Sequence, residues 1–121
     1  MERSELIPVR FFRTEPGNEP VREFLRKELN PEEKKIVGDD IQTVQRCWPI
    51  GQPLVDGLGE GLYEVRSRLP NRICRTIFAM FNTKLILLHA FIKKTQKCPS
   101  HDKELARRRL RQLKSHEKDQ I

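Results

Sequence analysis

The sequence has few of the features that mark secreted, membrane or metal-binding proteins. It contains three cysteines and no Cys-x-x-Cys pair, so we expect no disulfide framework, in keeping with a reducing compartment. No apolar run approaches the roughly 18 residues that a membrane-spanning helix needs. The start MERSELIPVRFF lacks a basic region followed by a long apolar stretch, which argues against a signal peptide. We therefore expect a cytoplasmic protein with no membrane contact.

Repeats, low-complexity segments and a recognisable metal motif are missing as well. Cys98 and His101 have a spacing that occurs among metal ligands, but the two further ligands that zinc needs would have to come from elsewhere. We expect no metal and no other cofactor. The length of 121 residues suffices for one hydrophobic core, which predicts a single domain over 1–121 with residues 115–121 as a flexible tail.

Positive charge is abundant and unevenly distributed. Charged residues make up 34% of the chain, and the formal net charge is +7. Residues 1–40 carry 8 Lys/Arg against 10 Asp/Glu, whereas residues 41–121 carry 16 against 7. This balance favours an anionic partner, nucleic acid first, that contacts the C-terminal two-thirds of the chain.

The N-terminal third predicts a strand followed by a helix. The apolar run LIPVRFF, residues 6–12, is typical of a strand, and the turn-rich segment RTEPGNEP follows it. Asn18 or Glu19 can cap a helix whose first turn contains Pro20. Its apolar stripe consists of Val21, Phe24, Leu25 and Leu29.

A second helix is predicted to begin directly after the first. Asn30 is a capping residue, Pro31 suits the first turn, and Glu33 completes a capping-box pattern. This helix should end before Pro49. Its buried stripe consists of Ile36, Val37, Ile41 and Val44. Each helix has one apolar stripe. We therefore expect the two helices to form a hairpin that packs these stripes against a sheet.

Three strands and a last helix complete the predicted fold. The strands span about 61–68, 72–81 and 84–91, joined by the short turns LPN and NT, which predicts an antiparallel meander. After Pro99, apolar residues at helical spacing predict an amphipathic helix with a basic outer face. The fold class is therefore α+β: an N-terminal strand and a two-helix hairpin packed on an antiparallel β-meander, with a C-terminal helix.

Cations gather on the meander. Strand alternation places Glu64, Arg66 and Arg68 on one face, which we expect to be the outer one. The neighbouring strand adds Arg72 and Arg75, and the end of the next strand adds Lys93 and Lys94. A solvated face is the ordinary interpretation, but clustered like charges repel, and a phosphate would neutralise them.

Several segments resemble a known family. LYEVR, R-x-x-F in the following strand, LLHAFIKKTQKCP, A-x-x-R in the last helix and PVREFL in the first helix are similar to the phage Gp49-like, or HigB-type, toxins of the RelE/ParE superfamily. The resemblance extends from Phe11 to Arg109 and implies a RelE-like fold.

The resemblance implies the toxin of a type II toxin–antitoxin pair that cleaves mRNA on the translating ribosome without a metal. Its catalytic residues would be Arg66, Arg75, Lys93 and Lys94, with Arg72 competing with Arg75 for one position. Arginine can hold two phosphate oxygens of a charge-rich phosphorane, and a lysine among cations can transfer protons. The family's partners would be a HigA-like helix-turn-helix antitoxin, mRNA and the ribosome, and operator DNA through the antitoxin complex.

Two histidines and further basic residues are additional candidates. His101 could protonate the leaving group, whereas His89, inside LLHAF, is more typical of a hydrogen-bonded core residue. RNA phosphates would be held by Arg68, Lys97, Arg107, Arg108, Arg109 and Arg111, although the last four also fit the solvated face of a helix.

Two other functions share the basic charge and stay open. A ParE-like inhibitor of DNA gyrase has the same fold but needs no cation cluster for phosphoryl chemistry. A non-catalytic RNA-binding module would use the same cations only to hold a phosphate backbone, with a binding constant that depends on salt.

Overall fold

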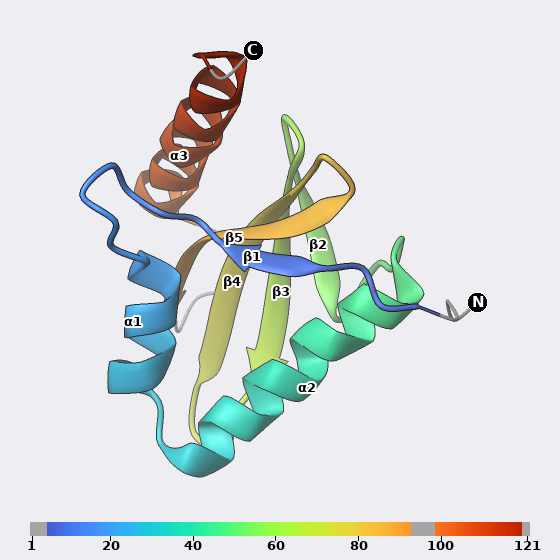
Figure 1. Ribbon diagram of the computed structural model, residues 1–121. Coiled ribbons are helices and arrows are strands. Elements are labelled where there is room, and N and C mark those ends of the chain that lie inside the picture. Colours follow the sequence, from blue (N-terminus) through green and yellow to red (C-terminus); the bar gives the residue numbers. More distant parts are fainter. Residues whose placement is uncertain (1–4, 93–98, 120–121) are drawn as a thin grey trace.

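A five-stranded mixed sheet forms the centre of the protein (Figure 1). The computed structural model describes residues 5–92 and 99–119. The strands are ordered β1-β5-β4-β3-β2, where β2 to β5 form an antiparallel meander and β1 pairs parallel to β5. Their bounds are β1 Val9–Phe11, β2 Val55–Gly59, β3 Leu62–Arg68, β4 Ile73–Phe81 and β5 Lys84–Ile92.

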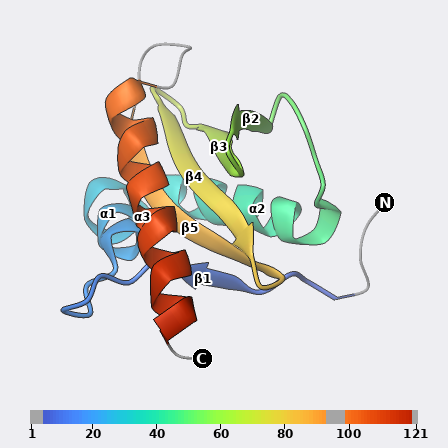
Figure 2. The same ribbon diagram turned by 90° about the horizontal axis from the view of Figure 1, so that it is seen from above.

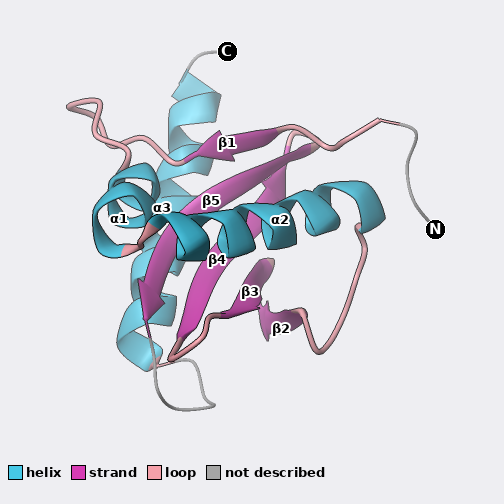
Figure 3. Ribbon diagram, turned by 90° about the horizontal axis from the view of Figure 1, so that it is seen from below, coloured by secondary structure: helices cyan, strands magenta, loops and turns pink. Residues whose placement is uncertain are grey.

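Helices cover both faces of this sheet. The helices α1 (Pro20–Glu28) and α2 (Pro31–Cys47) lie on one face, and α3 (Ser100–Asp119) lies on the other (Figures 2 and 3). Each face has its own apolar core: one contains Phe78 together with residues of α1 and α2, and the other contains Ile77 together with residues of α3. Both residues are fully buried. No helix in the described part of the chain is long and apolar enough to cross a membrane.

The predicted order of elements is confirmed, and so is the predicted start of α2. The side chain of Asn30 accepts a hydrogen bond from the Glu33 N–H at 2.9 Å, and the Glu33 side chain accepts one from the Asn30 N–H at 3.0 Å. This capping box satisfies two backbone donors that a helix start leaves without partners. The turn between β4 and β5 also lies at the predicted NT, where Asn82 and Thr83 both have positive φ.

Strand β2 was not predicted. Its sequence, VDGLG, contains two glycines and has a bulge between Gly57 and Gly59, so it lacks the regular alternation that identifies a strand. The predicted first strand, residues 6–12, is also longer than the observed β1. At the C-terminus, α3 includes residues 115–119, which the sequence places in a tail.

An ion pair joins the start of α2 to the β3–β4 turn. The Arg72 Nε–H donates to Glu33 Oε2 at 3.0 Å, and its Nη2 donates to Glu33 Oε1 at 2.9 Å and to the Glu28 carbonyl at 2.7 Å. These contacts hold the pKa of Glu33 below its usual range, mainly through the hydrogen bond from Arg72. Arg72 therefore fastens the helical layer to the sheet.

The Arg72→Met variant tests this role through its pH dependence. Because the folded pKa of Glu33 lies below its unfolded value of about 4.3, the stability it contributes is complete above that value and is lost as pH falls through the folded pKa. We expect a lower urea midpoint for the variant at pH 7 and a smaller difference from the unaltered protein at pH 3. Arg46→Met, an exposed change in α2, is the control. A difference that stays constant with pH would contradict this account.

Candidate functional site

The arginines of β3 and β4 lie on the sheet face that carries α3. The sequence predicts an outer face for these residues, but α3 packs on part of this face and two of the residues are buried. Glu64 is fully buried, and only 2% of the Arg75 side chain is exposed. Arg66 keeps 25% of its side chain exposed. Of these two arginines, Arg66 has the more exposed side chain.

Two carboxylates hold this pair of arginines. The Arg66 Nε–H donates to Glu64 Oε1 at 3.0 Å, and its Nη2–H donates to Asp56 Oδ2 at 3.0 Å. Arg75 Nη1 lies 3.6 Å from the same Glu64 oxygen. The positive surplus predicted for this face is therefore smaller than the sequence suggests, because Asp56 reaches Arg66 from the strand that was not predicted.

Strand register places these side chains in two rows. Arg66, Arg75 and Phe91 are direct neighbours across β3, β4 and β5, and Glu64, Ile77 and His89 form the next row. Helix α3 begins near the second row and runs from there toward the β2–β3 turn, as its contacts with His89 and Glu60 show. The arginine row lies beyond the start of α3. We call Arg66, Arg75, Glu64 and Asp56 the arginine cluster.

A bulge in β5 brings His89 to the same face. Leu87 pairs with Phe78 and His89 with Ile77, so Leu88 is an extra residue that reverses the alternation. The Nε2 atom of His89 lies 2.7 Å from Asp102 Oδ1. Burial lowers the pKa of His89 and outweighs the opposing hydrogen bond to Asp102. The imidazole is consequently neutral at pH 7.

The basic residues of α3 divide into two groups. Arg109 donates from Nη1 to the Leu88 carbonyl at 2.7 Å, and burial lowers its pKa. Arg107 pairs with Glu60, at 2.6 Å from Nε to Oε2, and with Glu104. These two arginines fasten α3 to the sheet. Arg108 and Arg111 are exposed, and Arg111 lies 3.5 Å from Glu104 Oε1.

The remaining predicted site residues are not part of the arginine cluster as defined above, or fall outside the described residues. Arg72 binds Glu33 on the other side of the sheet. Arg68 is exposed at the end of β3, and His101 is exposed in the first turn of α3. The three predicted lysines, Lys93, Lys94 and Lys97, fall outside the described residues.

Sequence reasoning missed two acidic residues of the site. Asp56 precedes a glycine-rich segment, GLGEG, whose pattern indicates a tight hairpin and hence a strand beside β3. Asp102 follows His101 in the first turn of the predicted helix, a common position for an acidic residue. Neither signal identifies the side chain that each residue would contact.

The arrangement offers charge stabilisation and one neutral imidazole, and the thiol of Cys74 is not activated. Burial raises the pKa of the Cys74 thiol to about 11, which leaves it protonated and unreactive. Among the described residues, no group of three His, Cys, Asp or Glu side chains could hold a metal ion. The arginine cluster can hold an anion at Arg66, whose position is set by two carboxylates.

Comparison with known proteins agrees with the fold and with the resemblance in the sequence. The model of the family described as phage-derived protein Gp49-like (DUF891) matches residues 23–111. A search of curated proteins finds no match. The family match includes most of α1, all of α2, the four strands of the meander and α3 as far as Arg111. Because it covers well over half of the chain, the chain belongs to the Gp49-like family, whose members are RelE/HigB-type toxins.

Proposed function

We propose that this toxin is a metal-independent endoribonuclease that cleaves mRNA on the translating ribosome and so inhibits translation. The observation that carries the proposal is the cross-strand pair Arg66 and Arg75, joined through the buried carboxylate of Glu64. In metal-free cleavage the 2′-hydroxyl attacks the adjacent phosphorus, and the transition state carries extra negative charge. A fixed guanidinium at the phosphate stabilises that charge.

The two arginines have different parts in this proposal. Arg66 contacts the phosphate, because a quarter of its side chain is exposed and its guanidinium is held in place by Glu64 and Asp56. Arg75 is buried and acts as a positioning residue that keeps Glu64 in place. A guanidinium held before substrate arrives needs little reorganisation in the transition state, which is the source of its catalytic effect.

Proton transfer requires other groups, because an arginine stays protonated. The family resemblance assigns this task to Lys93 and Lys94, which follow β5. A lysine near cations has a lowered pKa and can exchange a proton at neutral pH. His101 is a further candidate for protonating the leaving group. His89 is held by Asp102 and supports the start of α3, so we propose a structural role for it.

The proposed partners follow from this activity. Membership of the toxin family implies an antitoxin. We propose that this antitoxin is a HigA-like helix-turn-helix protein that also carries the complex to its operator DNA. The exposed Arg108 and Arg111 of α3 are proposed to contact ribosomal RNA phosphates, together with Arg68 and Lys97.

Arg66→Ala provides the first test. The change removes the proposed phosphate contact, and we expect cleavage to fall about 100-fold or more, the size of effect seen when a transition-state donor is lost. The measurement is a map of new mRNA 5′ ends after brief induction in a bacterium, at matched protein levels. Arg46→Ala, an exposed change on the opposite face, is the control and should cleave normally.

The same experiment separates the alternatives. New ends inside translated regions that disappear in Arg66→Ala would support the nuclease. Arrested growth with lost DNA supercoiling and no new ends would favour a gyrase inhibitor. Gradual, salt-dependent loss of RNA binding in the variants, with no cleavage in any protein, would favour a non-catalytic RNA-binding module.

Lys94→Ala tests the proton-transfer assignment. We expect this variant to lose cleavage while it still binds ribosomes, because a lysine that moves protons contributes to the reaction more than to binding. Single-turnover cleavage of ribosome-bound mRNA and ribosome pelleting measure the two properties separately. Lys35→Ala is the matched control, since Lys35 is exposed on α2 and pairs with Asp39. Normal cleavage by Lys94→Ala would refute the assignment.

The Arg108→Ala, Arg111→Ala double variant tests the outer face of α3. If both residues contact phosphates, the slope of the logarithm of the ribosome-binding constant against the logarithm of salt concentration should decrease in magnitude by about 1.5 to 2. Binding is measured at several KCl concentrations with Arg46→Ala as control. An unchanged slope would show that this face is merely solvated.

A further inference from the structure

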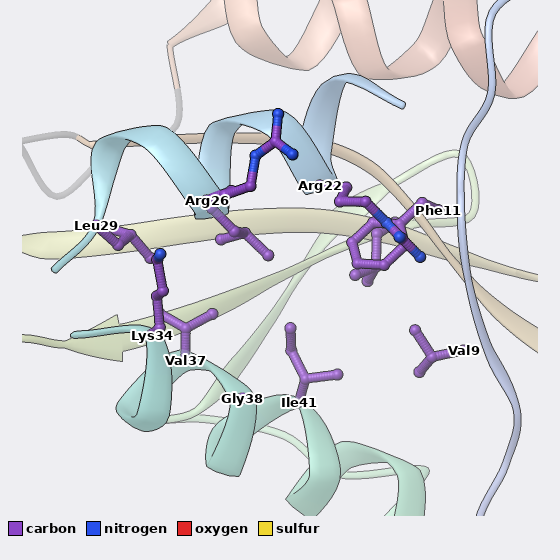
Figure 4. A pocket seen from close by; sticks show the side chains of 11 residues that line it. Val9, Phe11, Arg22, Arg26, Leu29, Lys34, Val37, Gly38 and Ile41 are labelled. Carbon is purple, nitrogen blue, oxygen red and sulfur yellow. The ribbon is translucent and has the colours of Figure 1, made fainter. Parts of the chain in front are cut away.

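A pocket of about 360 Å³ lies on the sheet face opposite the arginine cluster. It lies between α1 and α2, and residues of β1 and β5 complete its wall (Figure 4). Apolar side chains make up most of its wall: Val9, Phe11, Leu25, Leu29, Val37, Ile41 and Leu87. Small-molecule sites usually combine apolar walls with several converging polar groups. Here the polar residues of the wall are three long cations, which is more typical of a groove for a peptide.

The charged side chains that line the pocket are all cations, and one of them, Arg22, pairs with Glu19 at 3.0 Å from Nε to Oε1. Lys34 extends from α2 toward Leu29 at one end, and Arg22 lies over the ring of Phe11 at the other, 5.0 Å from its centroid (Figure 4). Lys34 makes no ion pair or side-chain hydrogen bond with any residue that the structure describes. None of the eleven residues that line the pocket is acidic. An occupant with acidic groups beside its apolar anchors would complement both ends.

A glycine inside α2 gives an independent indication. Gly38 lines the pocket, and a Cβ built on it would meet no heavy atom within 4 Å. Glycine is the least favourable residue in a helix interior apart from proline, and its φ here is not positive. The described fold therefore contains no packing reason for this glycine. A partner that approaches the helix backbone closely at this point would supply one.

We propose that this pocket binds an amphipathic segment of the antitoxin, with apolar side chains over Gly38 and acidic residues beside Lys34 and Arg22. The inference rests on the proposed toxin function for the existence of this partner. An acidic segment is favoured over a second copy of this chain because the net charge of +7 opposes self-association. The pocket and the arginine cluster lie on opposite faces of the sheet, so binding and cleavage can be measured independently.

The decisive variant is Gly38→Leu, which adds a side chain at a residue that lines the pocket. We expect its unfolding midpoint in urea to equal or exceed that of the unaltered protein, because leucine favours helix and the space is open. We expect its affinity for the antitoxin to fall at least tenfold. The probe is the purified product of the neighbouring gene, titrated calorimetrically, together with 20-residue peptides that tile its sequence. A variant that folds at least as well but binds less cannot owe its defect to unfolding.

A charge reversal supplies the matched control. Lys34→Glu should weaken antitoxin binding, whereas Lys35→Glu, one residue away and paired with Asp39, should not. The peptide that binds should combine apolar and acidic residues, and Gly38→Leu should weaken its binding as well. Sedimentation of the unaltered protein should show a monomer.

Four results would overturn the proposal: no binding of the neighbouring gene product to the unaltered protein, unchanged affinity in Gly38→Leu, equal effects of the two lysine reversals, or a dimer that Gly38→Leu dissociates. Mapping of mRNA 5′ ends without antitoxin keeps this test separate from the nuclease. Gly38→Leu should cleave like the unaltered protein. If the antitoxin does not bind as predicted, the cleavage result is unaffected. If no cleavage is observed, the binding result is unaffected.

Discussion

The buried carboxylate of Glu64 is the contact on which the arginine cluster depends. A charged group that leaves water is costly unless it is paired, and one oxygen of Glu64 lies within ion-pair distance of both Arg66 and Arg75. Removing Glu64 would leave two neighbouring cations with repulsion between them. Because these residues come from adjacent strands, the pairing of β3 with β4 and the geometry of the cluster require each other. Asp56 then extends the same dependence to β2.

Features that depend on local sequence could be predicted. The capping box at Asn30 and Glu33 needs only residues three apart, and the tight turn at Asn82 and Thr83 is set by its own short loop. The α+β order and the presence of Arg66 and Arg75 on one sheet face follow from hydrophobic period and strand alternation. Pattern therefore predicted the order of the elements, whereas the choice of Arg66 and Arg75 as site residues came from the family resemblance and stays a prediction.

Features that depend on distant partners could not be predicted. The bulge at Leu88 turns His89 toward α3, whereas simple alternation places it on the other face. Arg72 binds Glu33, which is far away in the sequence. The sequence pattern therefore did not reveal that Arg72 stands outside the arginine cluster. The burial of Glu64 and Arg75 was not predicted either, because strand alternation shows which residues share a face but not what covers that face.

The parallel pairing of β1 with β5 affects the order in which parts of the protein fold during synthesis. Residues 9–11 find their partners only in residues 85–87, so the N-terminal strand emerges from the ribosome long before the strand beside it exists. Pairing between residues far apart in the sequence delays folding, because the entropy cost of closing the long loop precedes the favourable contacts. The layer of α1 and α2 thus gains its complete sheet late in synthesis. The sheet that carries the arginine cluster is therefore complete only after β5 has been synthesised.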